Sequence, residues 1–369
     1  MKVPFLDLKA QYSSIKEEVN LAVLNILENT SFILGSSVKN FENEFAAAHN
    51  INYCYGLSNG TAGNHLVLWA LGIKPGDEVI IPANTFIATA WGATLCGATP
   101  VFVDCTPDTY NIDPSKIEAA ISSKTKAIVA VHLYGQPADL DSLKVIADKH
   151  NLFLVEDAAQ AHFAEYKGKK IGGIGIASSF SFYPGKNLGA YGEAGAAATN
   201  DPQLAAKFKM IREHGASDKY YHKVYGHNYR MEGIQGAVLG VKLKYLQEWT
   251  EKRRNAAKKY FELLKDIKSI QLPIEADYSK HVYHLFVINV KAGKRDELQR
   301  FLDKNEISTG LHYPVPLHLQ ECFAHLDYKK GDMPCSENIS ENGLSLPIYP
   351  EISDNQLQYV SEIIHQYFK

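Results

Sequence analysis

The chain has 369 residues, which is long enough for two domains or for one large domain with an appendage. Its 38 basic and 41 acidic residues leave a net charge of −3, and no basic tract favours a nucleic acid as a partner. The N-terminal residues contain no hydrophobic segment of signal-peptide length, no apolar run could span a membrane, and the five cysteines are scattered without metal-ligand spacing. We therefore expect a cytoplasmic protein with reduced thiols, no metal site, and neither a membrane nor a nucleic acid as partner.

Short β-rich runs alternate with amphipathic helical patterns from about residue 53 to residue 200. The strand candidates are 53–57, 78–82, 100–104, 127–133, 152–156 and 177–183. The helical stretches between them include Asn64–Leu71, Ile87–Cys96, Pro114–Ile121 and Leu140–His150. This alternation is typical of an α/β fold with a mostly parallel sheet and helices on both faces. Ligands of such sheets bind at the carboxyl ends of the strands.

The pattern changes after residue 200. Long helices are predicted for Pro202–Glu213 and for a run from about Ile234 to Leu264. A smaller α+β domain follows, with strand-like Tyr283–Val290, helical Arg295–Lys304, a stretch rich in proline and histidine at 312–318, and a closing helix, Ser353–Tyr367. We place the boundary inside the helical segment near 245–265, which gives a large domain, 1–250, and a small C-terminal domain, 251–369.

Two residues of opposite charge fall at the carboxyl ends of predicted strands. Asp157 ends an apolar, strand-forming run, where a buried carboxylate is costly without a cationic partner. Lys186 follows a short strand of aromatic and serine residues and lies between Gly185 and Gly189. Pyridoxal 5′-phosphate (PLP) chemistry requires such a pair: a lysine that forms a Schiff base and a carboxylate that keeps the pyridine nitrogen protonated. The pair predicts a PLP enzyme; a helix cap for Asp157 and a surface position for Lys186 are the alternatives.

Further residues suit the same cofactor. Gly60 and Thr61 open a predicted helix, whose free N–H groups and dipole favour a phosphate. Ser181 could add a hydroxyl, Phe86 could stack on a flat ring, and Gln160 could reach the cofactor's phenolic oxygen. Each has a plain structural alternative, namely a helix cap, a strand serine or a core aromatic. Their order along the chain, together with Asp157 and Lys186, favours one cofactor site.

The chain resembles the DegT/DnrJ/EryC1/StrS sugar aminotransferases over essentially its whole length. The segments that carry the resemblance are Pro4–Leu8, Ser58–Ala62, Glu156–His162, Ser181–Lys186, Arg212–Gly215 and Gly226–Met231. The resemblance implies the fold type I, aspartate aminotransferase-like architecture. It also implies PLP as the cofactor, with pyridoxamine 5′-phosphate as its amino-carrying form.

The resemblance also assigns roles to single residues. It implies that Lys186 is the Schiff-base lysine and that Asp157 pairs with the pyridine nitrogen. The other implied cofactor contacts are Gly60, Thr61 and Ser181 on the phosphate, Phe86 on the ring, and Gln160 on the ring hydroxyl. Asn228 would reach the phosphate from the neighbouring subunit, which implies a homodimer with shared active sites. Without the resemblance, a turn residue beside Gly226 is the simpler interpretation of Asn228.

Within the family, the chain is most similar to enzymes that aminate C-3 of dTDP-linked 3-keto-6-deoxyhexoses. The shared segments are Lys219–His222, Gly226–Arg230, Lys242–Leu243 and Trp249. This similarity implies a dTDP-keto sugar and L-glutamate as substrates, in the biosynthesis of a deoxyamino sugar for a surface polysaccharide or glycan. The implied pocket residues are Tyr183, Lys219, His312 and Tyr313, with His318 near the pyrophosphate. A polar loop position is the alternative for both histidines.

Two positions depart from the family pattern, and several other functions stay open. Phe163 stands where glycine is common, and Glu232–Gly233 replaces a more usual pair, which affects the expected substrate pocket and not the cofactor. A C-4 aminotransferase of the same family and a non-catalytic PLP or sugar-nucleotide sensor are the alternatives. Lys186 argues against a sugar dehydratase, in which histidine replaces the lysine. The closest match to a dinucleotide-binding turn, Gly172–Gly175, opens a predicted strand and not a helix.

Overall fold

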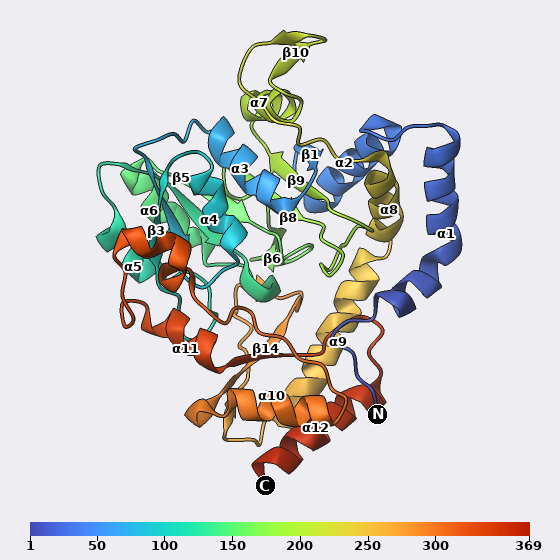
Figure 1. Cartoon of the computed structure of the whole chain (residues 1–369), viewed down its shortest axis with the longest axis vertical. Coiled ribbons are helices and arrows are strands. Elements are labelled where there is room, and N and C mark those ends of the chain that lie inside the picture. Colours follow the sequence, from blue (N-terminus) through green and yellow to red (C-terminus); the bar gives the residue numbers. More distant parts are fainter.

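The structure, a computed structural model that describes residues 1–369, is built around a seven-stranded sheet (Figure 1). The strand order is β1-β9-β8-β5-β4-β2-β3. Their bounds are Tyr53–Leu57 (β1), Glu78–Pro82 (β2), Thr99–Val103 (β3), Thr125–Val131 (β4), Phe153–Asp157 (β5), Ala177–Ser181 (β8) and Gly195–Thr199 (β9). Only β9 runs against its neighbours, because it pairs antiparallel with both β1 and β8. The predicted, mostly parallel α/β architecture is therefore confirmed.

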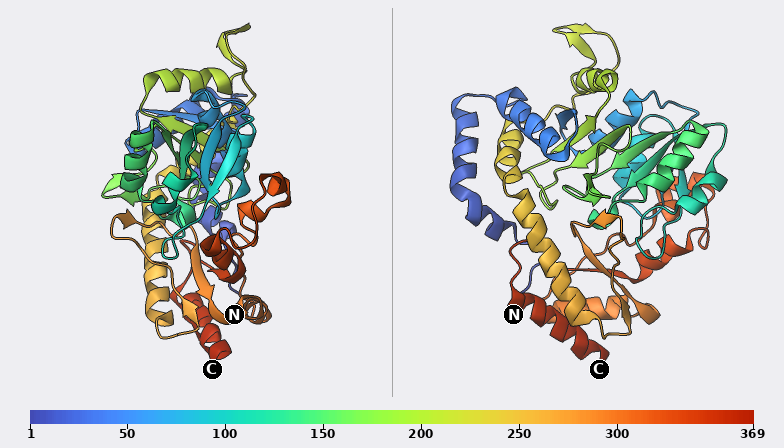
Figure 2. Two further views of the ribbon diagram at one scale, coloured as in Figure 1. Left: turned by 90° about the vertical axis from the view of Figure 1, so that its left-hand side faces the viewer. Right: turned by 180° about the vertical axis from the view of Figure 1, so that it is seen from behind.

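Helices cover both faces of the sheet (Figure 2). One face packs against α3 (Gly60–Ala70), α4 (Ile87–Thr94) and α7 (Pro202–Arg212); the other packs against α2 (Gly35–His49), α5 (Pro114–Ala120), α6 (Leu140–His150) and α8 (Gly233–Leu243). Successive strand residues enter different cores, as Ile80 and Ile81 do, because side chains alternate across a strand. Both faces are thus buried, which explains the continuous apolar runs in the sequence.

Strand β9 was not among the predicted strands. Its sequence, Gly-Ala-Ala-Ala-Thr, lacks the branched and aromatic residues that favour strands. The structure explains the small residues, because α3 packs closely over this part of the sheet. A Cβ atom at Gly195 would lie 2.3 Å from the backbone carbon of Asn59, which directly precedes α3. Close packing, and not local propensity, therefore decides this strand.

Two helix boundaries also differ from the predictions. Helix α3 begins at Gly60, four residues before the predicted start, because the Asn59 side chain caps it by accepting from the backbone N–H of Ala62 (2.8 Å). The predicted run from Ile234 to Leu264 is two helices, α8 and α9 (Leu246–Leu264). They separate at Lys244 and Tyr245, whose side chains both bind Glu18 of helix α1 (Leu8–Glu28).

A second core of 21 buried residues lies below the sheet in Figure 1. It is formed by the three-stranded sheet β12-β14-β15 and by α10, α12 and the C-terminal part of α9. The bounds are Ile270–Gln271 (β12), Phe286–Val290 (β14), Gly343–Leu346 (β15), Arg295–Lys304 (α10) and Asp354–Phe368 (α12). Val3 also packs in this core and pairs with Ile307, so the first residues of the chain join the C-terminal part. The division at 250/251 stays a prediction; it falls inside α9, whose Leu246 lies in a sheet core and whose Leu264 lies in the second core.

The remaining strands and α-helices are short. They are β6 (Glu165–Tyr166), β7 (Lys169–Lys170), β13 (Ser279–Lys280), α11 (Pro334–Asn342) and the hairpin β10–β11 (Ala216–Asp218 and Tyr221–His222). The hairpin projects from the body of the molecule at the top of Figure 1. No helix is both long enough and apolar enough to cross a bilayer.

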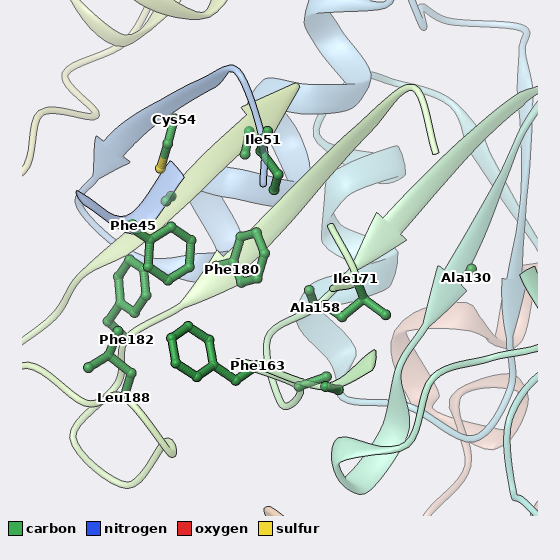
Figure 3. Close-up of a cluster of buried hydrophobic side chains, with 14 of the residues drawn as sticks. Phe45, Ile51, Cys54, Ala130, Ala158, Phe163, Ile171, Phe180, Phe182 and Leu188 are labelled. Carbon is green, nitrogen blue, oxygen red and sulfur yellow. The ribbon is translucent and has the colours of Figure 1, made fainter. Parts of the chain in front are cut away.

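Phe163 lies in a core and not in a substrate pocket (Figure 3). Its φ angle is 66°, in the left-handed region that glycine adopts at low cost. This geometry accounts for the glycine that we expected at this position. The Phe163 ring is buried beside His49, whose Nε2 accepts from the Phe163 backbone N–H (3.3 Å). The expectation that this substitution alters the substrate pocket is therefore wrong.

Candidate active site

A cavity of about 990 Å³ opens at the carboxyl ends of β5 and β8, between the main sheet and the second core. Ten of the thirteen predicted site residues line it: Gly60, Thr61, Phe86, Asp157, Gln160, Ser181, Tyr183, Lys186, His312 and Tyr313. Asn228, Lys219 and His318 do not. The main sheet and the C-terminal part of the chain thus bring together residues that lie more than two hundred positions apart in the sequence.

Asp157 is the buried acid of this cavity and is 4% exposed. Its Oδ2 accepts from Asn64 Nδ2 (3.0 Å) and from the hydroxyl of Thr89 (2.8 Å), and its Oδ1 accepts from the backbone N–H of Ala159 (3.1 Å). These donors hold the carboxylate in one orientation, but all three are neutral. No cation forms an ion pair with Asp157 in this chain, so the acid is suited to a cationic N–H of a bound molecule.

Asn64 and Thr89 are functional residues that the sequence did not reveal. Asn64 lies one turn into α3 and also accepts a hydrogen bond from the hydroxyl of Ser179 on β8. Thr89 lies on α4 and shares a hydrogen bond with Thr85 (2.9 Å). Both are buried polar residues on mostly apolar helices, and α3 also contains the buried His65, so this signal alone did not single them out.

The start of α3 offers donors for an anion in the same cavity. The backbone N–H groups of Gly60 and Thr61 begin α3 and have no acceptor within the chain. Ser181 ends β8 directly beside them, and a Cβ atom at Gly60 would lie only 2.7 Å from Ser181 Cβ. The absence of a side chain at Gly60 therefore lets the helix start and the strand end meet. Free amides, a hydroxyl and a helix N-terminus together fit a phosphate.

Lys186 lies on the turn from Tyr183 to Gly189. The turn is closed by two backbone hydrogen bonds, from Lys186 N to Tyr183 O (2.8 Å) and from Ala190 N to Phe182 O (2.7 Å). The Lys186 amine lines the cavity and has no hydrogen-bond partner in the protein. Burial lowers the pKa of Lys186 to about 8, although the charge of Asp157 acts in the opposite direction. About a tenth of this amine is therefore neutral at pH 7, far more than for an ordinary lysine, and this fraction is able to act as a nucleophile.

Gln160, Tyr313 and Phe86 form one wall of the cavity. Gln160 Oε1 accepts from the backbone N–H of Tyr134 (2.6 Å), and its Nε2 donates to the Tyr313 hydroxyl (2.9 Å). Phe86 precedes α4, and its ring centroid lies 5.5 Å from that of Tyr313. The Phe86 side chain is 52% exposed, so one ring face is free for a planar ligand.

The other predicted substrate residues, together with the predicted phosphate contact Asn228, divide into three groups. Tyr183 and His312 line the cavity, and His312 Nδ1 lies 2.8 Å from Ser345 Oγ. His318 is 2% exposed, and its Nε2 lies 3.1 Å from Glu337 Oε1, in the protein interior. The expected approach of His318 to a pyrophosphate is therefore wrong, because the loop before α11 encloses the Glu337 carboxylate that binds it. Lys219 and Asn228 are exposed and lie outside the cavity of their own chain.

The residues present fit PLP. The unpaired acid Asp157, the unpaired amine Lys186 and the free donors of Gly60, Thr61 and Ser181 match the ring nitrogen, the aldehyde and the phosphate of the cofactor. When bound, PLP supplies an electron sink for the substrate carbon that loses a proton. Lys186 can form the covalent attachment and move the proton, while Asp157 holds the ring nitrogen in its protonated form.

Comparisons with known proteins lead to one family. Residues 13–365 match the family model described as the DegT/DnrJ/EryC1/StrS aminotransferase family. A pleiotropic regulatory protein of Geobacillus stearothermophilus is 47% identical, over 100% of this chain and 99% of its own. The dTDP-3-amino-3,6-dideoxy-alpha-D-galactopyranose transaminase of Aneurinibacillus thermoaerophilus is 43% identical, over 99% of each chain.

A solved structure shows the same fold. The crystal structure of DesV from S. venezuelae, in complex with a ketimine intermediate, is 41% identical and superposes with a TM-score of 0.97 over 100% of this chain and 99% of its own. This likeness confirms the predicted fold type I architecture. The chain therefore belongs to the DegT/DnrJ/EryC1/StrS family and is a PLP-dependent sugar aminotransferase.

Proposed function

We propose that this enzyme transfers the amino group of L-glutamate to C-3 of a dTDP-3-keto-6-deoxyhexose. The product is a dTDP-3-amino-3,6-dideoxyhexose for the biosynthesis of a surface polysaccharide or glycan. The observation that carries the transamination chemistry is the cavity in which neither Asp157 nor Lys186 forms an ion pair. The transaminase of Aneurinibacillus thermoaerophilus, which is named for a dTDP-3-amino-3,6-dideoxy sugar, supports the regiochemistry and the nucleotide.

The residues around the cavity have different roles in the proposed reaction. Lys186 accepts a proton from the donor carbon and later returns one to the sugar carbon, for which its amine must be neutral during part of the cycle. Asp157 stays oriented by Asn64, Thr89 and Ala159 throughout. Tyr183, His312 and Tyr313 line the open side of the cavity, where the sugar would enter.

We further propose that the enzyme is a homodimer in which each active site uses residues of both chains. Asn228 is exposed, and its side chain accepts only from Arg230 Nε (3.0 Å) within its own chain. Lys219 lies on the projecting hairpin, next to the exposed Tyr220 and Tyr221. Both residues are free to contact a second copy, and a site that combines them with Lys186 needs such a copy.

The decisive assay compares sugar substrates. The pyridoxamine form of the enzyme is offered 3-keto and 4-keto dTDP-sugars in parallel, and NMR locates the new amine. UDP-linked sugars serve as a control for the nucleotide. We expect amination at C-3 of the dTDP sugar. Nitrogen at C-4 would replace the C-3 assignment by that of a C-4 aminotransferase, and no product from any of these sugars would refute the proposed substrate.

A further inference from the structure

The cavity contains one permanent cation besides the reacting lysine. Its ionisable lining residues include Lys186, Arg253, His284 and His312. Burial and the nearby Lys186 lower the pKa of His312 to about 4 and hold the pKa of His284 well below its usual value. Both imidazoles are therefore neutral at neutral pH. Arg253 alone remains to bind an anion that enters with the substrate.

Arg253 is held rigidly by one end of its guanidinium group. The residue lies on α9 and is 3% exposed. Nη1 donates to the carbonyl oxygens of Ile348 (2.8 Å), Tyr283 (3.3 Å) and His284 (3.4 Å), which belong to two separate segments of the second core. This arrangement fixes the plane of the group before any ligand arrives.

The other edge of the same guanidinium group is free. Nε is buried and has no hydrogen-bond partner, and Nη2 makes no hydrogen bond within the chain. Arg253 forms no ion pair; Glu351 acts on it only at longer range. The Nε and Nη2 hydrogens of an arginine point the same way and bind the two oxygens of a carboxylate together. Burying a cation with this edge unpaired lowers the stability of the folded chain, unless a ligand accepts hydrogen bonds from the edge.

Arg253 is connected to the segment that carries Lys186 through His284 and Asn187. Its Nη1 binds the carbonyl of His284, and Nδ1 of His284 lies 3.2 Å from Oδ1 of Asn187, the residue after Lys186. The proposed phosphate donors, Gly60 at the start of α3 and Ser181 at the end of β8, belong to the main sheet and its helices and not to this second core. An amino acid whose amine meets the Lys186 region can therefore direct its carboxylate to Arg253.

We propose that Arg253 binds the α-carboxylate of the amino donor through Nε and Nη2. This inference rests on the proposed function only in that the donor is an α-amino acid. The keto sugar has no carboxylate, so Arg253 serves one half of the reaction and not the other. It thereby contributes to the selection of amino acids over simple amines as donors.

The test separates the two half-reactions in the intact, PLP-loaded enzyme. Single-turnover mixing with L-glutamate, with L-alanine or with 4-aminobutyrate, which lacks an α-carboxylate, follows the loss of the absorbance of the lysine-bound cofactor. The pyridoxamine form is mixed separately with the keto sugar. Arg253→Met removes the charge, and Arg253→Lys keeps the charge but loses the fork. Arg254→Met is the matched control, because Arg254 is the next residue on α9 and does not line the cavity. Its Nη1 donates to Glu275 and to the carbonyl of His281.

We expect Arg253→Met to lower the second-order rate constants of glutamate and alanine by about 10- to 100-fold, the effect of losing hydrogen bonds to a charged group. Arg253→Lys should lie in between. The rates with 4-aminobutyrate and with the keto sugar should stay within about threefold of the wild type, as should all rates of Arg254→Met.

Three results would overturn the proposal. An equal loss in both half-reactions would make Arg253 a structural clamp of the second core, and thermal unfolding of each variant would report the same defect. An unchanged rate with glutamate would remove the role altogether. A loss with glutamate but not with alanine would assign Arg253 to the side-chain carboxylate. Failure of the proposed function would give a different result: the wild-type enzyme would not react with glutamate, or it would aminate C-4 of the sugar. The role of Arg253 could then still be tested by comparing the rates of alanine and 4-aminobutyrate.

Discussion

Lys186 and Asp157 meet at one cavity but have opposite surroundings. The acid is held by three neutral donors, whereas the amine has no partner and is destabilised as a cation by burial. A site of this kind keeps its charges available for a ligand, because neither residue neutralises the other by a direct ion pair. The cost of such unpaired groups falls on the stability of the free protein and is recovered when the cofactor binds.

The first prediction concerns the pH dependence of cofactor capture. Only a neutral amine attacks the PLP aldehyde, and the Lys186 amine loses its proton with a pKa of about 8. The association rate of the cofactor-free enzyme should therefore rise about tenfold per pH unit below this value and level off above it. Stopped-flow absorbance measures this rate. A rate that keeps rising to about pH 10, the range of an ordinary lysine, would contradict the lowered pKa.

The second prediction concerns Asp157. Asp157→Asn keeps the shape of the side chain but loses the charge that holds the pyridine proton, so kcat should fall by at least about 100-fold. The unfolding temperature should change little, and excess PLP should not restore kcat. Asp201→Asn is a suitable control, because Asp201 caps α7 away from the cavity and should affect stability alone. A near-normal kcat for Asp157→Asn would make Asp157 a structural residue.

At the scale of elements, helix α8 supports the turn that carries Lys186. Lys242 on α8 is 1% exposed, and its Nζ donates to the carbonyl of Gly189 (2.5 Å) at the end of that turn. Gly189 itself is required there, since a Cβ atom would lie 2.3 Å from the carbonyl oxygen of Pro184. No carboxylate pairs with Lys242, and burial lowers its pKa to about 7. We infer that Lys242 positions the turn at some expense to stability.

The third prediction follows from this contact. Lys242→Met should lower kcat about tenfold in both half-reactions, whereas the free energy of unfolding should stay the same or rise, because a buried unpaired charge is removed. The difference in unfolding free energy between wild type and variant should shift in favour of the wild type from about pH 7 upward, because the unfolded chain then binds more protons than the folded one. Lys244→Met, on the surface beside Glu18, is the control. Loss of stability without loss of kcat would refute the positioning role.

At the scale of the whole molecule, the cavity forms where the main sheet and its helices pack against the second core. The main sheet supplies Asp157 and the free amides of α3, and the second core supplies His312 and the carbonyls that fix Arg253. Exposed apolar residues lie on α1 and beyond the hairpin, where Leu21, Leu24 and Tyr225 are all more than half exposed. Surfaces of this kind are suited to a second copy of the chain.

The fourth prediction tests the shared site. Lys186→Ala and Asn228→Leu are expected to be inactive or strongly impaired alone but to recover about one quarter of wild-type activity when coexpressed, because half of the randomly formed dimers would contain one complete site. Lys186→Ala coexpressed with the double variant is the control, since no complete site can form. Mixed dimers without recovery would show that Asn228 does not act across the interface.

The sequence by itself determined the periodic features of this protein. Branched residues in β2, β4 and β5 predicted buried parallel strands, and the carboxyl ends of β5 and β8 located Asp157 and Lys186, because strand periodicity and charge are local properties. The family resemblance added the sugar-nucleotide substrate and the expectation of an active site shared between two subunits. These expectations needed no knowledge of which segments pack together.

The tertiary structure alone decided the partners of these residues. Asn64 lies 93 positions from the Asp157 that it orients. In the sequence, nothing distinguishes Arg253 from the other basic residues of α9; only the structure shows that its Nη1 donates to three distant carbonyls. Close packing against α3 explains why the alanine-rich segment of β9 forms a strand. The contact between His318 and Glu337 holds His318 in the protein interior, outside the cavity. Each depends on contacts between segments far apart in the chain, which local propensity and periodicity do not encode.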